Sequence, residues 1–205
     1  ALLVPAGGTL TKTLEVRKGS VMNYDNLRLM LQSQCQCDPT DFQDEIYDDV
    51  TFSVHFTPSA TDVNLKKPTD NWTYNTKLPT AEVNGVQKHY MDVVIDGFDV
   101  NYDNFHRIML QYKPSSGSDN DWTTLMSYYN DQTLYDQAVK NGMNAEMIKA
   151  ADAGTIKYSW FMDDLQDQRY DLRTVGTSMI NNAEVYNYSA VHSGIKDMYN
   201  PRLFG

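Results

Sequence analysis

The chain has 205 residues, 41% hydrophobic and 21% charged, which excludes a disordered segment and predicts one or two folded domains. Its formal net charge of −10 disfavours nucleic-acid binding and adhesion to an anionic membrane, because both partners carry negative phosphates. No apolar run has the length of a membrane-spanning helix, so we expect no membrane insertion. Aromatic residues make up 12%, which favours strands, whose pleated surface accommodates large rings.

Residues 1–61 are predicted to form a strand-rich unit. Leucines occupy every second position of residues 27–31, and Phe and Val alternate with Thr, Ser and His in residues 51–56. This period of two indicates half-buried strands. A unit of about sixty residues is marginal alone, so it is either a small sandwich or a set of strands donated to a neighbour. We expect it to pack against the rest of the chain.

An acidic loop is predicted between these two strands, around Pro39. Calcium takes about six to eight oxygen ligands, and the twelve-residue helix–loop–helix motif with its central glycine is absent here. The sequence leaves a structural calcium site and a solvated acidic loop both open. The carboxylates that would hold calcium belong to Asp38, Asp41, Asp44, Asp48 and Asp49. We expect no other cofactor.

Cys35 and Cys37 are the two cysteines of the chain and are separated by one residue. On a strand, residues two apart point to the same side, and a disulfide between them would be strained. A zinc site needs about four ligands, and no further cysteine exists. We therefore expect two small, partly buried thiols with no disulfide and no zinc.

Residues 57–85 combine three prolines with many Thr and Asn, a composition that predicts a linker or edge segments. We place the domain boundary here, so that residues 62–205 form the second domain. Period-two strands follow at residues 90–98 and 105–113. A Ser-, Gly- and Asx-rich turn then predicts a hairpin with a returning strand over residues 122–129.

A helix is predicted over residues 133–152, with Thr133 as its N-cap and a C-cap signal at Asn141-Gly142. Met143, Met147 and Ala151 recur at a spacing of four. Such a stripe favours core packing over a binding groove. Strands resume near residue 155.

This order of elements resembles a fibronectin type III or Ig-like β-sandwich, that is, a mainly β, antiparallel fold with a short helical insert. Three stretches carry the resemblance: IMLQYKP followed by DWTTL as the middle hairpin, LQDQRYDLRTV as a corner, and NYSAV as the last strand. In such a corner Tyr170 would bury its ring and bond its hydroxyl to nearby backbone, with Leu172 facing the core. The corner loop lacks the family's Pro-Gly, and the strand at Met91 lacks its buried Trp.

The stretches WTTLMSYYND, YDLRTVGTS and GIKDMYNPRLFG resemble tandem modules of this kind in large Bacteroidetes surface proteins. The resemblance implies an extracellular or cell-surface location, neighbouring domains in a longer chain, and a glycan or a host protein as partner. It also implies a structural or adhesive role without enzyme activity.

Catalytic patterns are missing from the sequence. None of the four histidines (His55, His89, His106 and His192) lies in a recognisable catalytic setting, and there is no Gly-x-Ser-x-Gly motif. The carboxylates of Asp163 and Asp164 are adjacent, so on a strand they would point to opposite faces and would not form a matched acid and base. The sequence predicts a non-catalytic protein.

A carbohydrate-binding module attached to a glycan-processing surface protein is the alternative function. Flat aromatic rings stack on the apolar faces of sugars, but the same rings fill the core of a sandwich. The candidate rings are Trp122, Tyr128 and Tyr129, with Trp72 before the hairpin. Core packing is favoured for Trp122. Tyr128 and Tyr129 are adjacent on a strand, so one of them is expected to be exposed.

Overall fold

A computed structural model describes residues 7–16, 23–34, 42–150 and 154–199, with the side chains of 31–34 and 42–48 left out. The chain divides into two compact units, residues 1–57 and 58–205. The division comes after Thr57, slightly before the boundary placed on the sequence.

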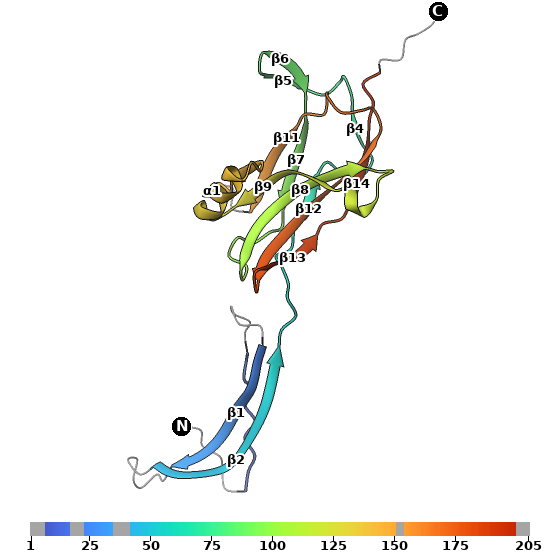
Figure 1. Cartoon of the computed structure of the whole chain (residues 1–205). Coiled ribbons are helices and arrows are strands. Elements are labelled where there is room, and N and C mark those ends of the chain that lie inside the picture. The colour runs from blue at the N-terminus through green and yellow to red at the C-terminus, as the bar shows by residue number, and fades with distance from the viewer. Residues whose placement is uncertain (1–6, 17–22, 35–41, 151–153, 200–205) are drawn as a thin grey trace, which may run out of the picture. The chain divides into compact units, whose positions relative to one another are not determined.

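The N-terminal unit is a two-stranded antiparallel ribbon of β1 (Asn23–Gln34) and β2 (Phe42–His55) (Figure 1). Because β2 already begins at Phe42, much of the predicted acidic loop is strand instead. The described residues of this unit contain no second sheet. The described residues therefore form a ribbon and no small sandwich, and the alternative of strands that need a neighbour remains.

One face of the ribbon is apolar. Leu27 pairs with Phe52 and Leu29 with Val50, and side chains of directly paired residues lie on the same side of a sheet. This confirms the period of two that the sequence shows. The predicted half-burial does not extend to Leu29, Val50 and Phe52, which are between 36% and 52% exposed.

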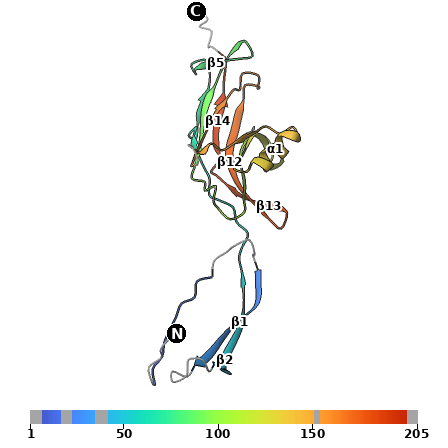
Figure 2. The same cartoon turned by 90° about the vertical axis from the view of Figure 1, so that its left-hand side faces the viewer.

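The C-terminal unit contains a seven-stranded sheet in the order β10-β9-β8-β12-β14-β4, with β13 paired to β12 (Figures 1 and 2). The pairs β10–β9 and β14–β4 are parallel and the others are antiparallel. Its strands are β4 (Trp72–Tyr74), β8 (Phe105–Pro114), β9 (Thr123–Tyr129), β10 (Ala145–Met147), β12 (Arg169–Ile180), β13 (Ala183–Tyr188) and β14 (His192–Lys196).

A second sheet has the order β11-β7-β3, and a separate hairpin joins β5 to β6. These strands are β3 (Asn64–Lys67), β5 (Thr80–Val83), β6 (Val86–His89), β7 (Met91–Asp96) and β11 (Thr155–Trp160). The chain is mainly β, as predicted.

Residues 57–85 are not a linker but contain the predicted edge segments, because β3 and β4 lie at sheet edges and β5 follows them. Pro68 directly follows β3 and Pro79 directly precedes β5, where a missing N–H removes no bond from the middle of a ladder. The prolines therefore mark strand ends in a folded segment.

The helix α1 (Gln132–Lys140) is shorter than predicted. Its N-cap is Asp131 and not Thr133: the Asp131 carboxylate accepts a hydrogen bond from the Leu134 N–H at 2.9 Å. The C-cap at Asn141 is confirmed, and Gly142 follows with a φ of 76°. Among the described residues, no helix is long and apolar enough to cross a membrane.

The second half of the predicted helix is replaced by strand β10, so the methionine stripe is not a helix face. The backbone of β10 runs parallel to β9. The Ser127 N–H donates to the Asn144 carbonyl at 3.0 Å, and the Ile148 N–H donates to the Tyr129 carbonyl at 2.8 Å. Three residues at a spacing of four do not outweigh a free strand edge that offers these bonds.

Both sheets contribute to one hydrophobic cluster. Trp160 lies at its centre, with ring centroids 5.8 Å from Trp72 and 5.4 Å from Tyr112. Trp160 on β11 is the cross-strand partner of Met91 on β7. The family's buried Trp is missing from the strand at Met91, and the neighbouring strand β11 provides a buried Trp in its place. Other members are Leu65, Val93, Ile95, Ile108, Leu110, Ile156, Tyr170 and Leu172.

The predicted corner is confirmed. Tyr170 is buried, and its hydroxyl donates to the Gln166 carbonyl at 2.9 Å while accepting from the Gln168 amide at 3.1 Å. Leu172 faces the core and is fully buried. The corner thus holds the chain at the start of β12, the central strand of the larger sheet.

We predict that Gly194→Ala lowers the free energy of unfolding by about 3 kcal/mol, because the added methyl would overlap the Trp72 ring. Gly154→Ala is the control, since nothing lies within 4 Å of its new methyl. Urea unfolding monitored by tryptophan fluorescence measures both variants. Equal stabilities of the two variants would show that the packing around Trp72 is not tight.

Candidate functional site

Strand β12 has a second face that points away from the core, and we call the matching face of β9, β8, β12 and β13 the outer face. Alternation along β12 places Asp171, Arg173, Val175 and Thr177 there. Val175 and Thr177 are nevertheless fully buried. Their partners on β13 are large tyrosines, which explains why an outward position carries apolar and small side chains.

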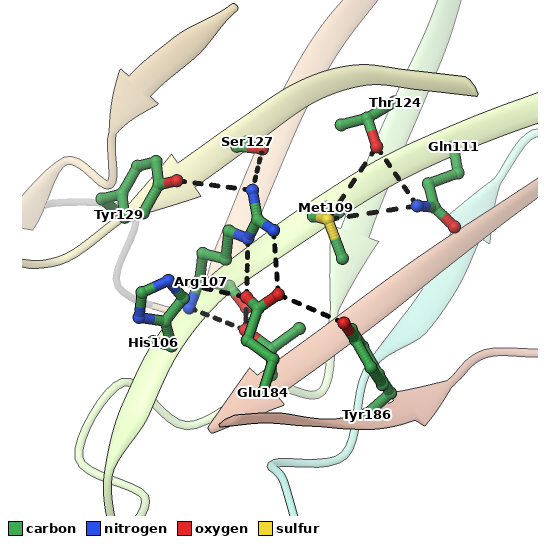
Figure 3. Close-up of polar contacts among 10 residues, drawn as sticks. His106, Arg107, Met109, Gln111, Thr124, Ser127, Tyr129, Glu184 and Tyr186 are labelled. Atoms are coloured by element: carbon green, nitrogen blue, oxygen red, sulfur yellow. Dashed lines mark hydrogen bonds and ion pairs between the residues drawn. The ribbon is translucent and has the colours of Figure 1, made fainter. Parts of the chain in front are cut away.

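Arg107 and Glu184 form a bidentate ion pair on the outer face (Figure 3). The guanidinium Nε and Nη2 donate to the two carboxylate oxygens at 2.8 and 2.9 Å. Its Nη1 lies 3.3 Å from the Ser127 hydroxyl and 3.4 Å from that of Tyr129. Such a fork holds both side chains in one orientation.

The charges of this pair stabilise each other. Burial would raise the pKa of Glu184, but the hydrogen bonds and charge of Arg107 outweigh it and lower that pKa. Burial would lower the pKa of Arg107, but the hydrogen bonds and charge of Glu184 outweigh burial and raise that pKa. His106 has a lowered pKa because it is buried, although Glu184 opposes the shift. Glu184 is thus engaged on both oxygens, which suits a structural pair better than a proton donor.

A row of polar side chains crosses the outer face beside this pair. The Arg173 Nε donates to the Gln111 carbonyl oxygen at 3.0 Å, and the Gln111 amide donates to the Thr124 hydroxyl at 3.2 Å (Figure 3 shows Gln111 and Thr124). At the Thr124 end the row meets a cavity of about 240 Å³ that Ser127 and the segment 142–144 also line.

Aromatic rings lie at the other end of the row. Tyr186 and Tyr188 are stacked with centroids 6.1 Å apart and planes at 21°, and they are 49% and 51% exposed. The Arg173 guanidinium lies 4.4 Å from the Tyr188 ring centroid and 3.9 Å from that of Trp122. Trp122, Arg173, Tyr188 and Tyr186 form a series that we call the aromatic ladder.

Three of the four rings predicted to bind a ligand are at most 6% exposed, which leaves them unable to stack on one. Trp72 lies in the core, where its indole N–H donates to the His192 carbonyl at 3.2 Å. Tyr128 also lies in the core. Tyr129 does point to the opposite face, but it is buried there beside His106 at 5.8 Å. Only Trp122 remains in the candidate site.

Sequence reasoning missed Tyr186 and Tyr188. Their signal is the Tyr-x-Tyr spacing, which places both rings on one face of a strand. The preceding Asn181 and Asn182, with φ of 50° and 62°, form a two-residue turn of the kind that favours hairpins. An edge strand with one exposed aromatic face could have been inferred from this pattern.

Asp163 is engaged by its surroundings through both carboxylate oxygens. The Tyr74 hydroxyl lies 2.6 Å from its Oδ1, and the His89 N–H donates to its Oδ2 at 3.0 Å. Burial and the Asp163 charge raise the pKa of Tyr74. The Met162 N–H donates to the same hydroxyl at 3.0 Å. This cluster links β4 and β6 to the segment after β11, and its groups are engaged with one another.

The calcium hypothesis stays a prediction. Asp38 and Asp41 lie outside the described residues, as do both cysteines, and the side chains of Asp44 and Asp48 are not described. Asp49 accepts a hydrogen bond from the Arg28 guanidinium across the ribbon. In the part of the chain with described side chains, no three His, Cys, Asp or Glu are grouped to hold a metal ion.

Comparisons of the chain with protein-family models, with curated proteins and with solved structures found no match.

We predict that Glu184→Gln costs about 3 kcal/mol of unfolding free energy at about pH 7, because it leaves Arg107 buried without a counter-ion. The native pKa of Glu184 is lowered. Its contribution is therefore present above its unfolded pKa of about 4.3 and is lost as the pH falls through the native pKa. The gap between wild type and variant should close at low pH.

Urea unfolding at a series of pH values measures this gap. The control is Asp164→Asn, which breaks an exposed ion pair with Lys88 and should cost less than about 1 kcal/mol. A gap between wild type and Glu184→Gln that is independent of pH would contradict the assignment of the lowered pKa to this pair.

Proposed function

We propose that this chain is a non-catalytic structural or adhesive module of a larger secreted or cell-surface protein, with a fibronectin type III-like β-sandwich in its C-terminal unit. The observation that carries the proposal is the apolar face of the ribbon β1–β2. An isolated two-stranded ribbon is marginally stable in water, and it becomes stable when further strands or another sheet cover its apolar face.

The face consists of paired apolar side chains of the kind that are buried in a folded sheet. Leu29 and Val50 are cross-strand partners and are both about half exposed, although such pairs stabilise a sheet by mutual packing and burial. The opposite face carries the Arg28–Asp49 ion pair and tolerates water. A neighbouring domain of the same protein is the partner that we propose for the apolar face.

Two features support the sandwich. Strands from two sheets share the cluster around Trp160, and Tyr170 makes the hydroxyl-to-backbone bond of a tyrosine corner. The parallel additions β10 and β4 and the helix α1 are departures from the family pattern.

The pairing of the partly buried titratable groups supports a non-catalytic role. Glu184 is held by Arg107, and Asp163 by Tyr74 and the His89 backbone. Catalytic acids and bases need a proton acceptor or donor that faces a substrate. In the described residues these groups instead face one another.

We predict that a thiol at position 29 reacts quickly in the isolated chain and at least about tenfold more slowly in the intact parent protein, because a neighbour covers the apolar face there. The variant is Leu29→Cys in a background with Cys35→Ser and Cys37→Ser. Labelling with a membrane-impermeant maleimide, read by mass spectrometry, gives both rates.

The control is Tyr199→Cys in the same background, since Tyr199 is 83% exposed. It should react equally fast in the isolated chain and on intact cells that carry the parent protein. Fast labelling of position 29 in the parent would contradict the covered face. Labelling of position 199 that requires cell lysis would contradict a surface location.

A further inference from the structure

We propose that the aromatic ladder is a binding site for an acidic saccharide, whose ring packs against the exposed parts of Tyr186 and Tyr188 and whose carboxylate or sulfate binds the Arg173 guanidinium. The inference rests on the adhesive part of the proposed function and gives it a ligand class. Its evidence is independent of the ribbon, because all of these residues belong to the C-terminal unit.

Tyr186 and Tyr188 provide the aromatic surface of the proposed site. Tyr186 and Tyr188 occupy alternate positions on β13, so both rings project from the outer face, where they stack on each other with centroids 6.1 Å apart. Half of each side chain is exposed, whereas Tyr128, Tyr129 and Trp72 are buried. Tyrosine offers a flat apolar face with little conformational entropy to lose, which suits contact with the C–H face of a pyranose.

The Arg173 guanidinium provides the positive charge of the proposed site. Two of the other cations on the outer face are neutralised, Arg107 by Glu184 and Lys113 by Asp171, and Arg169 at the start of β12 is exposed to solvent. No described carboxylate forms an ion pair with Arg173; the exposed Asp119 acts on its charge from a longer distance. A partly buried guanidinium without a directly paired carboxylate favours an anion that arrives with a ligand.

Arg173 is also held ready for such an anion. Its planar group lies between the rings of Trp122 and Tyr188, and its Nε is engaged by Gln111. Burial lowers the pKa of Arg173, but a guanidinium remains protonated at any physiological pH. Its orientation is therefore set before a ligand binds, which reduces the entropy lost on binding.

The polar row gives room for more than one sugar. From Tyr188 it runs through Arg173 and Gln111 to Thr124 and the cavity at the edge of β9. Four neighbouring strands span about 14 Å, the length of a short oligosaccharide. Amide and hydroxyl groups along the row match the hydroxyls of a sugar.

The test uses two pairs of probes that differ in their anionic group alone: trigalacturonate with its methyl ester, and sulfated lactose with lactose. Each is titrated into the ¹⁵N-labelled full chain, and amide shifts in β12 and β13 are followed by NMR. We expect at least one acidic probe to bind at millimolar or lower concentration. We expect its neutral counterpart to bind about tenfold more weakly, and added salt to weaken the acidic probe.

Variants locate the site. Arg173→Gln and Tyr186→Ala should each weaken the acidic probe about tenfold or more, whereas Tyr186→Phe, which keeps the ring, should bind within about twofold of wild type. Arg169→Gln on the same strand and Tyr199→Ala are controls that remove an exposed cation or ring elsewhere. Circular dichroism and thermal unfolding confirm that each variant is folded.

Three results would overturn the proposal: no binding of either acidic probe, equal affinity for an acid and its neutral counterpart, or unchanged binding in Arg173→Gln. Equal affinity for both forms would indicate a neutral-sugar platform without an anion site. Failure in this titration would leave the thiol-labelling result on the ribbon untouched, so the two proposals fail separately.

Discussion

The packing of Trp160 is the contact on which the C-terminal unit depends. Its ring extends from the β11-β7-β3 sheet and meets Trp72 and Tyr112, which belong to the larger sheet. Large rings contribute more buried area than any other side chain, so this contact joins the two sheets at one point. Gly194 provides the space that the Trp72 ring occupies. With this side of the larger sheet packed in the core, its opposite side is the outer face.

Strand β12 divides these two roles residue by residue. Its core side holds Tyr170 and Leu172, and its outer side holds Arg173 between two rings. The Arg107–Glu184 pair orders the outer face next to the ladder, since both carboxylate oxygens of Glu184 and all three guanidinium nitrogens of Arg107 have partners. A rigid sheet with a pre-oriented cation is a good support for recognition, because few side chains must be ordered when a ligand binds.

Much of the fold followed from local patterns, but the site did not. Tyr170 and the Asn141 C-cap could be predicted because their chemistry is complete within a few residues. Strand β10 could not, because its bonds come from β9, a partner chosen by the tertiary fold. Tyr129 is buried by contacts with His106 and Arg107, which belong to a different strand. The alternation of side chains along its own strand therefore led to the wrong prediction that one of Tyr128 and Tyr129 is exposed. Arg173 becomes distinctive because it lacks the directly paired carboxylate that Arg107 and Lys113 have, and a sequence does not show which charges are paired.

The edges of the sheets have a consequence for how the protein tolerates crowding. In the larger sheet β10 and β4 have three residues each, and β3 at an edge of the smaller sheet carries Lys66 and Lys67 and is followed by Pro68. Short strands, lysines and proline all discourage an edge from adding strands of another molecule. At these three edges, copies of the C-terminal unit could therefore stand close together without joining their sheets, whereas β11 and β13 present edges of six residues.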